Sequence, residues 1–250
     1  MTLTQLIVLG LAFFAVAMLY TTVGHAGASG YLATMALVGA APDVMRPTAL
    51  TLNILVAAIA VYRFRRARLV SWNGLWPFLL GSAPLAAFGG ALHLAPGTYY
   101  VAVGLVLLAS AALLVWRVYG TGFRRDDEGM AVTKAIAVPL GAVIGLLSGI
   151  TGTGGGIFLS PTLLLLGWTG PKTTAGISAP FIFVNSAVAL AAGSFGAGSL
   201  PPELPWLAAA AVTGALVGTW LGLSKLSQRG LITTLAVVML VAAGKLLAFA

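Results

Sequence analysis

The sequence predicts an all-α protein that crosses a lipid membrane many times. Hydrophobic residues make up 60% of the 250 residues and charged residues only 7%, whereas soluble domains carry about 25% charged residues. The surface of a soluble fold must face water, and this chain has too few polar side chains to supply one. Since about 20 helical residues cross the hydrocarbon core of a bilayer, the length allows about eight to ten crossings.

Ten apolar segments follow one another along the chain, and each is expected to form a helix. In chain order they cover residues 3–23, 28–41, 47–62, 72–94, 98–116, 131–149, 157–167, 173–193, 204–223 and 231–248. The first has no Lys or Arg before it and is longer than the apolar core of a signal peptide, so we interpret it as a membrane span. The second and the seventh are too short for ordinary spans, and each follows a glycine-rich stretch.

A polar linker at the middle of the chain predicts a division into two halves. Residues 120–130 contain the most strongly polar run, Arg124-Arg125-Asp126-Asp127-Glu128. They separate a first transmembrane repeat, residues 1–119, from a second, residues 131–250. Landmarks recur in the two halves: the offset from Asn53 to Asn185 is 132 residues, and that from Gly81 to Gly214 is 133. A near-constant offset indicates duplication, with chance matching of glycines as the alternative.

Basic residues indicate which loops face the cytoplasm, because cytoplasmic loops are enriched in Lys and Arg. The densest cluster has four arginines between residues 63 and 68. If all ten segments cross, eleven Lys and Arg residues lie in the cytoplasm, and only Arg46 and Lys245 lie outside. If the two short segments are re-entrant and eight segments cross, nine of these residues lie in the cytoplasm and four lie outside. Ten crossings put the linker 120–130 in the cytoplasm and both termini in the periplasm. Five crossings per half make the repeats inverted, as in many secondary transporters.

The glycine-rich stretches are the strongest functional signal. Three consecutive glycines, 154–156, should break a helix, because Gly destabilises a helix interior by about 1 kcal/mol relative to Ala. Unwound backbone in a membrane persists only where protein or water satisfies it. The helix that follows presents N–H groups and partial positive charge, which can hold an anion. Tight packing through small residues is the alternative, and it accounts for scattered glycines such as Gly214 and Gly218.

The candidate substrate-binding residues gather around the two glycine-rich stretches. They are Gly24, His25, Gly27, Ser29 and Gly30 at the first stretch, Thr151, Gly152, Thr153, Gly154, Gly155 and Gly156 at the second, and Asn53, Ser178 and Asn185 on neighbouring segments. The two asparagines are expected to face the interior, where a helix-to-helix hydrogen bond and a ligand contact are equally open. The histidine is titratable, and proton transfer, an anion contact and plain packing are its alternative roles.

Several other classes of function are disfavoured. The chain has no cysteine, so disulfides, thiolate metal sites and Cys nucleophiles are excluded, and we expect neither a metal nor a cofactor. The glycine run lacks the Lys-Ser/Thr of a nucleotide-binding loop, and the net charge of +8 fits cytoplasmic loops better than nucleic-acid binding. Residues 27–30 have the Gly-x-Ser-Gly form of rhomboid proteases, yet His25 lies only one turn from Ser29, which suits packing more than catalysis.

Three motifs carry a resemblance to a known family. They are residues 152–161 (GTGGGIFLSP), a weaker echo at residues 24–31, and Ser178-Ala179-Pro180-Phe181 followed by Asn185-Ser186. In these motifs, and over nearly its whole length, the chain resembles the sulfite exporter TauE/SafE family, also called the TSUP permeases. The echo departs from the usual glycine run at His25, Ala26, Ala28 and Ser29, and Ala33-Thr34 replaces Ser-Pro. The resemblance implies a multi-pass permease of the bacterial inner membrane for sulfite, sulfonates or related sulfur-containing anions.

The sequence therefore predicts a transporter rather than an enzyme. A small anion is expected to bind near the midplane, between the two glycine-rich stretches, and alternating access would move one half against the other. An anion channel is the nearest alternative, and a rhomboid-like membrane enzyme is a more distant one. The lipid bilayer and the anionic substrate are the expected partners, nucleic acid is not, and assembly as a homodimer is left open.

Overall fold

The computed structural model builds its described residues from α-helices and short connections, which confirms that the protein is all-α as predicted. It describes residues 3–119, 132–193, 195, 200–223, 240, 243–244 and 246–248. The helices in these residues are α1 (Leu3–Thr21), α2 (Ala28–Leu37), α3 (Pro42–Arg66), α4 (Trp72–Ala91), α5 (Pro96–Tyr119), α6 (Lys134–Thr151), α7 (Gly156–Leu165), α8 (Pro171–Ala192) and α9 (Leu204–Leu223). The linker 120–130 lies outside the described residues. So does most of the tenth predicted segment, 231–248, whose described residues are helical.

Most of the long helices are suited to crossing a membrane. Among the described helices, six are long and apolar enough to do so: α1, α3, α5, α6, α8 and α9. α4 has 20 residues, and its Asn, Pro and Gly residues lower its hydropathy. Large apolar side chains point away from the bundle, including Leu11, Leu80 and Val143, which are 65%, 61% and 59% exposed. This surface suits lipid rather than water, and the chain is a polytopic membrane protein.

The two short helices have half the length of a span, as their segments predicted. α2 and α7 have 10 residues each, which at 1.5 Å per residue corresponds to about 15 Å. The hydrocarbon core of a bilayer is about 30 Å thick. Each short helix is therefore about half as long as the hydrocarbon core is thick.

The third helix is longer than the sequence analysis predicted. α3 begins at Pro42 rather than at residue 47 and continues to Arg66. Proline is favoured at the first helical position because its missing N–H is not needed there. Asp43 in the first turn complements the positive end of the helix dipole. The extension moves Arg46 from an expected loop into the second turn of a helix, where it becomes buried.

Two helix pairs pack closely through glycines. A side-chain carbon added at Gly145 of α6 would collide with the carbonyl oxygen of Ser82 in α4. One added at Gly214 of α9 would collide with the carbonyl oxygen of Phe14 in α1, and Gly218 meets the next turn of α1 in the same way. Small residues let helix backbones approach closely in membranes. The predicted packing role of the scattered glycines is confirmed at these positions.

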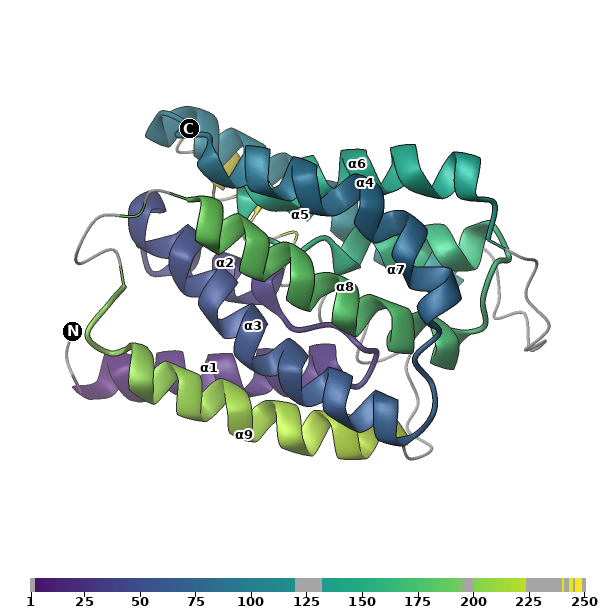
Figure 1. The fold of residues 1–250 in the computed structure, drawn as a ribbon. Coiled ribbons are helices and arrows are strands. Elements are labelled where there is room, and N and C mark those ends of the chain that lie inside the picture. The colour runs from purple at the N-terminus through teal and green to yellow at the C-terminus, as the bar shows by residue number, and fades with distance from the viewer. Residues whose placement is uncertain are drawn as a thin grey trace.

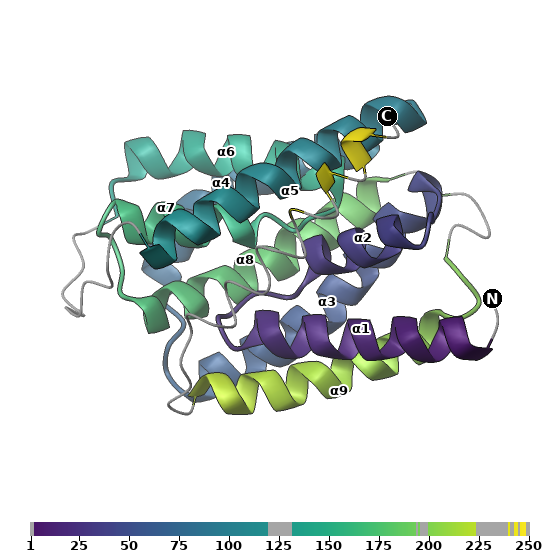
Figure 2. The same cartoon turned by 180° about the vertical axis from the view of Figure 1, so that it is seen from behind.

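The two halves of the chain interlock. α1 packs against α9, α6 packs against α4, and α3 packs against α8. Figures 1 and 2 show α1 and α9 on one side of the bundle, α4 and α6 on the opposite side, and α3 and α8 between them. The first long helix of each half thus packs on the fourth helix of the other half. The centre of the bundle, between the two pairs, is where the short helices begin.

The two ends of the bundle differ in charge. The end of α3, the loop 67–71 and the start of α6 lie at one end (Figure 1), which carries the arginines between residues 63 and 68 and also Lys134. The opposite end holds the start of α3 with Arg46, together with the ends of α4 and α6. The helix that follows the linker 120–130 therefore starts at the arginine-rich end. The assignment of this end to the cytoplasm stays a prediction.

Candidate functional site

The first break, residues 22–27, joins α1 to α2. Gly24 and Gly27 have φ angles of 80° and 102°, a left-handed backbone that residues with a side chain rarely adopt. The amide of Ala28, the first residue of α2, donates to Oδ1 of Asn53 in α3 at 3.1 Å. A side chain of a neighbouring span therefore holds the start of this half-length helix.

The second break, residues 152–155, joins α6 to α7 and is built from glycine. Gly152, Gly154 and Gly155 have φ angles of 81°, 75° and 76°. α6 ends immediately before them and α7 begins at Gly156. The predicted interruption of the helix by consecutive glycines is confirmed, because three of these residues adopt a conformation that only glycine reaches without strain.

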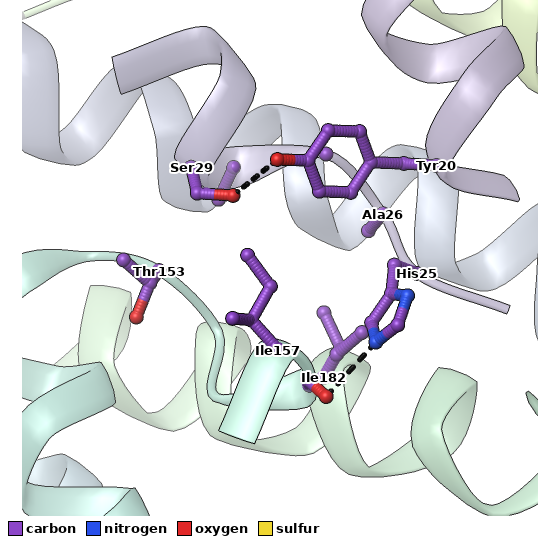
Figure 3. A pocket seen from close by; sticks show the side chains of 10 residues that line it. Tyr20, His25, Ala26, Ser29, Thr153, Ile157 and Ile182 are labelled. Carbon is purple, nitrogen blue, oxygen red and sulfur yellow. Dashed lines mark hydrogen bonds between the residues drawn. The ribbon is translucent and has the colours of Figure 1, made fainter. Parts of the chain in front are cut away.

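The two breaks face each other across a small cavity (Figure 3). Its lining consists of Tyr20, His25, Ala26, Gly27, Ala28, Ser29, Thr153, Gly156, Ile157 and Ile182. About 10 Å³ is open to the centre of a water molecule, which is roughly the space that one water needs. This space is too small for a polyatomic anion, which fits only after the two breaks have moved apart.

His25 connects the first break to the second half of the chain. It is 3% exposed, and its Nε2 lies 2.9 Å from the carbonyl oxygen of Gly156 (Figure 3) and 2.9 Å from Oγ of Ser160. Ser160 Oγ lies 2.7 Å from Oγ of Ser178 in α8. Because a carbonyl oxygen only accepts hydrogen bonds, Nε2 must carry a proton to bond Gly156. The imidazole thus begins a hydrogen-bonded chain that leads from the cavity into α8.

Ser29 belongs to a different hydrogen bond from His25. Its hydroxyl lies 2.7 Å from the hydroxyl of Tyr20 in α1 (Figure 3), while the His25 imidazole bonds Gly156 and Ser160. A nucleophilic serine needs its base within hydrogen-bond reach. The separate partners of these two side chains agree with the packing interpretation of the Gly-x-Ser-Gly sequence.

The two asparagines have structural partners. Asn53 bonds Ala28 through Oδ1, and its Nδ2 donates to Oγ of Ser186 in α8 at 3.2 Å. It therefore makes the helix-to-helix contact that was one of its two expected roles. Asn185 donates from Nδ2 to the carbonyl oxygen of Phe181 at 2.9 Å. Its Oδ1 is buried and has no hydrogen-bond partner among the described residues.

The fourteen candidate residues do not all reach the cavity. Those that line it are His25, Gly27, Ser29, Thr153 and Gly156. Those that lie behind the lining are Gly24, Gly30, Asn53, Thr151, Gly152, Gly154, Gly155, Ser178 and Asn185. Five further residues line the cavity without having been predicted: Ala26 and Ala28 of the first glycine-rich stretch, and Tyr20, Ile157 and Ile182. Their apolar bodies fit the pattern of ordinary spans, so no signal in the sequence set them apart.

Gly155, the last residue of the second break, and Gly156, the first residue of α7, face different surroundings. A side-chain carbon added at Gly155 would lie 2.9 Å from Ile144 and 3.0 Å from Phe181, which places this residue against α6 and α8. One added at Gly156 would point at Ile182 and lie 3.0 Å from Cδ2 of His25, at the cavity. Of the two, only Gly155 has a positive φ. Replacement of Gly155 would therefore test the need for a left-handed backbone, whereas replacement of Gly156 tests the role of the cavity in binding.

Arg46 is the main feature that the sequence analysis missed. The topology prediction placed it outside the membrane, yet it is 7% exposed. Its guanidinium donates to the carbonyl oxygens of Gly89, Gly90, Leu92 and Gly149 at 2.7, 2.6, 2.8 and 2.7 Å. Recognition of the helix start at Pro42 would have placed Arg46 within α3. No local pattern indicates that the ends of α4 and α6 meet at its side chain.

Comparison with known proteins finds one matching family and a similar bacterial protein. The family model described as "Sulfite exporter TauE/SafE" matches residues 9–246. A protein of Sinorhizobium fredii (strain NBRC 101917 / NGR234), named "Probable membrane transporter protein y4hK", is 38% identical over 98% of this chain and 99% of its own length. No solved structure matches the chain. The chain therefore belongs to the sulfite exporter TauE/SafE family, and it is a membrane transporter rather than an enzyme.

Proposed function

We propose that this transporter is a secondary permease of the inner membrane that carries a small sulfur-containing oxyanion, such as sulfite or an organosulfonate, by alternating access. The observation that carries the proposal is the position of the cavity, which lies between the two breaks and is lined by both. α2 begins at Ala28 and α7 at Gly156, both in the cavity wall. Two helix N-termini thus face one small space from opposite halves of the chain.

The lining has the chemistry of an anion site. Helix N-termini present N–H groups and partial positive charge. Ser29 and Thr153 add hydroxyl groups, and His25 adds an imidazole that carries a proton on Nε2. None of the described residues that line the cavity is acidic. An oxyanion can accept hydrogen bonds from all of these groups without placing an arginine in the cavity wall.

The arrangement of the helices supports movement between two states. The pairs α1·α9 and α4·α6 are tightly packed through glycine, so each pair can move as a unit. We infer that residues 1–119 and 131–250 are inverted five-helix repeats. In support, Gly24 and Gly152 are 128 residues apart, as are Gly27 and Gly155, and all four have positive φ angles. Opening would separate the two breaks from one side at a time.

The test combines binding with transport. Gly156→Ala puts a methyl group into the cavity beside His25, and we expect it to weaken sulfite binding at least about tenfold, since overpacking costs about 1–3 kcal/mol. Gly218→Ala, in the α1·α9 contact, is the matched control and should lower thermal stability while leaving affinity near normal. In proteoliposomes a carrier shows counterflow of labelled sulfite. Normal sulfite affinity in a folded Gly156→Ala protein would refute the site, and flux without counterflow would indicate a channel.

A further inference from the structure

Arg46 is a buried cation whose described hydrogen bonds all go to backbone carbonyls. Three acceptors, Gly89, Gly90 and Leu92, lie at the end of α4, and the fourth, Gly149, lies at the end of α6. Carbonyls in the last turn of a helix lack partners within the helix and carry partial negative charge. The guanidinium therefore ties α3 to two helix ends at once, and it closes this end of the bundle.

The bonding of this guanidinium is incomplete. Its Nε is buried and has no hydrogen-bond partner among the described residues. The ring of Phe195 covers the group, with the Arg46 Cζ atom 5.7 Å from the ring centroid. An unpaired donor on a buried cation is costly, and an anion would satisfy both the donor and the charge. The side chain has the planar fork that binds oxyanions through two parallel hydrogen bonds.

The position of Arg46 connects it to the transport site. Gly152, at the start of the second break, packs on the arginine, and a side-chain carbon added there would lie 3.1 Å from Cγ of Arg46. Thr151 and Thr153 flank this glycine, and their hydroxyls are 3.0 Å apart. Thr153 lines the cavity. Residues 151–153 thus join the packing around Arg46 to the cavity wall.

The corresponding position at the opposite end of the bundle is an alanine. Gly24, which matches Gly152 at the offset of 128 residues, packs on Ala175 near the start of α8 as Gly152 packs on Arg46 near the start of α3. A methyl side chain forms no hydrogen bond with helix ends. The two matched positions therefore close the bundle by different means, and of these two only Arg46 offers a charge that an anion can engage.

We propose that Arg46 is an anion-responsive latch at one mouth of the transport path. In the closed state it holds the ends of α4 and α6 against α3. An oxyanion arriving at this mouth, or leaving through it, replaces the carbonyls as the partner of the guanidinium and releases the two helices. The latch forms a second anion-binding position, distinct from the cavity. It rests on the proposed function only for the identity of the anion.

Cysteine labelling can test the latch directly, because the chain has no cysteine of its own. Thr151→Cys places a reporter between Arg46 and the cavity. A cationic, membrane-impermeant thiol reagent is applied to proteoliposomes, with the exposed positions Ala41→Cys and Ala67→Cys marking the two ends of α3. Arg46→Gln should speed labelling from the Arg46 end at least about tenfold, because the free energy of one hydrogen bond to a charged group corresponds to a factor of about this size. Arg46→Lys, which keeps the charge but loses the fork, should give an intermediate rate.

A second arginine of the same helix supplies the matched control. Arg63 also bonds a carbonyl, that of Leu216 at 3.0 Å, but at the opposite end of α3. Arg63→Gln should leave labelling from the Arg46 end unchanged. Thermal unfolding of every variant identifies any loss of fold, and if Arg46→Gln does not fold, the Arg46→Lys rate decides. Equal labelling rates in the folded parent, Arg46→Lys and Arg46→Gln proteins would overturn the latch.

Sulfite is the probe for the response to anions. It should speed labelling of Thr151→Cys in the protein that retains Arg46 and have no effect in the Arg46→Gln protein. If Arg46 only holds the helix ends together, labelling should be faster in Arg46→Gln, but sulfite should not change the labelling rate of the parent protein. That result, in a parent protein that does bind sulfite, would overturn the anion response. If sulfite does not bind the parent at all, the proposed substrate fails, whereas the latch is still judged from the Arg46→Gln rate.

Discussion

The first and second breaks have the same backbone outline and different side chains. Both use left-handed glycines at matching positions, Gly24 with Gly152 and Gly27 with Gly155. Between these glycines the first break carries a histidine and an alanine, whereas the second carries Thr153 and a further glycine. The first break is held by side chains, since His25 reaches across to the second half. The second is held by backbone conformation, which only glycine adopts without strain.

This difference separates the tasks of the two halves. The first break and the start of α2 supply His25 and Ser29 to the cavity wall, while the second break contributes the Thr153 hydroxyl and close-packed backbone. Two breaks of similar backbone outline thus differ in what they contribute, polar side chains at the first and close approach at the second. Substitutions of His25 and Ser29 should therefore act on binding, and substitutions of the left-handed glycines of the second break should act on folding.

The largest effect is expected from exchanging the residue types at one matched position. Gly154→Ala forces a side chain into a left-handed conformation and against the amide of Asn53, so it should lower the free energy of unfolding by roughly 2–5 kcal/mol. Ala26→Gly, at the corresponding position of the first break, should cost only about 1 kcal/mol. Thermal unfolding in detergent measures both. Equal losses would show that the two breaks do not differ in this way.

An intermediate effect is expected at His25. His25→Ala removes the hydrogen bonds to Gly156 and Ser160. It should weaken sulfite binding about tenfold, which corresponds to a loss of about 1.4 kcal/mol of binding free energy. His25→Gln keeps a donor and should lose less. The exposed His93 provides the control, because His93→Ala should leave affinity unchanged. Titration calorimetry gives the affinities, and a His25→Ala protein with normal affinity would reduce this residue to packing.

The smallest effect is expected at Asn185, and Asn53 provides the comparison. Asn53→Ala removes the cap of α2 and the bond to Ser186 and should destabilise the protein by about 1–2 kcal/mol. Asn185→Ala removes one bond to its own helix and also a buried oxygen that has no described partner, so its cost should stay below about 1 kcal/mol. Chemical denaturation compares the two variants. A larger loss at Asn185 would indicate an undescribed partner for that oxygen.

Local features of the sequence were enough to predict the helices and the breaks. Consecutive glycines favour a break in a helix because each one lowers helix stability, so the end of α6 before Gly152 could be read directly. The start of α3 was missed because the apolar run begins at residue 47, although Pro42 marks an earlier start. The burial of Arg46 depends on three helix ends that are distant in the chain. No pattern within one segment carries that information.

The candidate site was predicted at the level of the segment but not of the residue. Both stretches proposed for binding do line the cavity. Gly155 and Gly156 are indistinguishable in the sequence, yet a side chain added at one meets α6 and α8 and one at the other meets His25. The direction in which α7 leaves the break determines which of the two glycines faces the cavity. Tyr20 was missed for a related reason, since only the fold brings its hydroxyl to Ser29.

The exchange of helices between the halves constrains how the protein is made. α1 packs on α9, and α4 packs on α6, so neither half contains its own complete set of neighbours. During synthesis the first span enters the bilayer long before its partner has been translated, and its glycine-fitted face must remain against lipid or another protein until then. Contacts between such distant parts of a chain form late. The contacts of α1 with α9 can therefore form only after the ninth helix has been made.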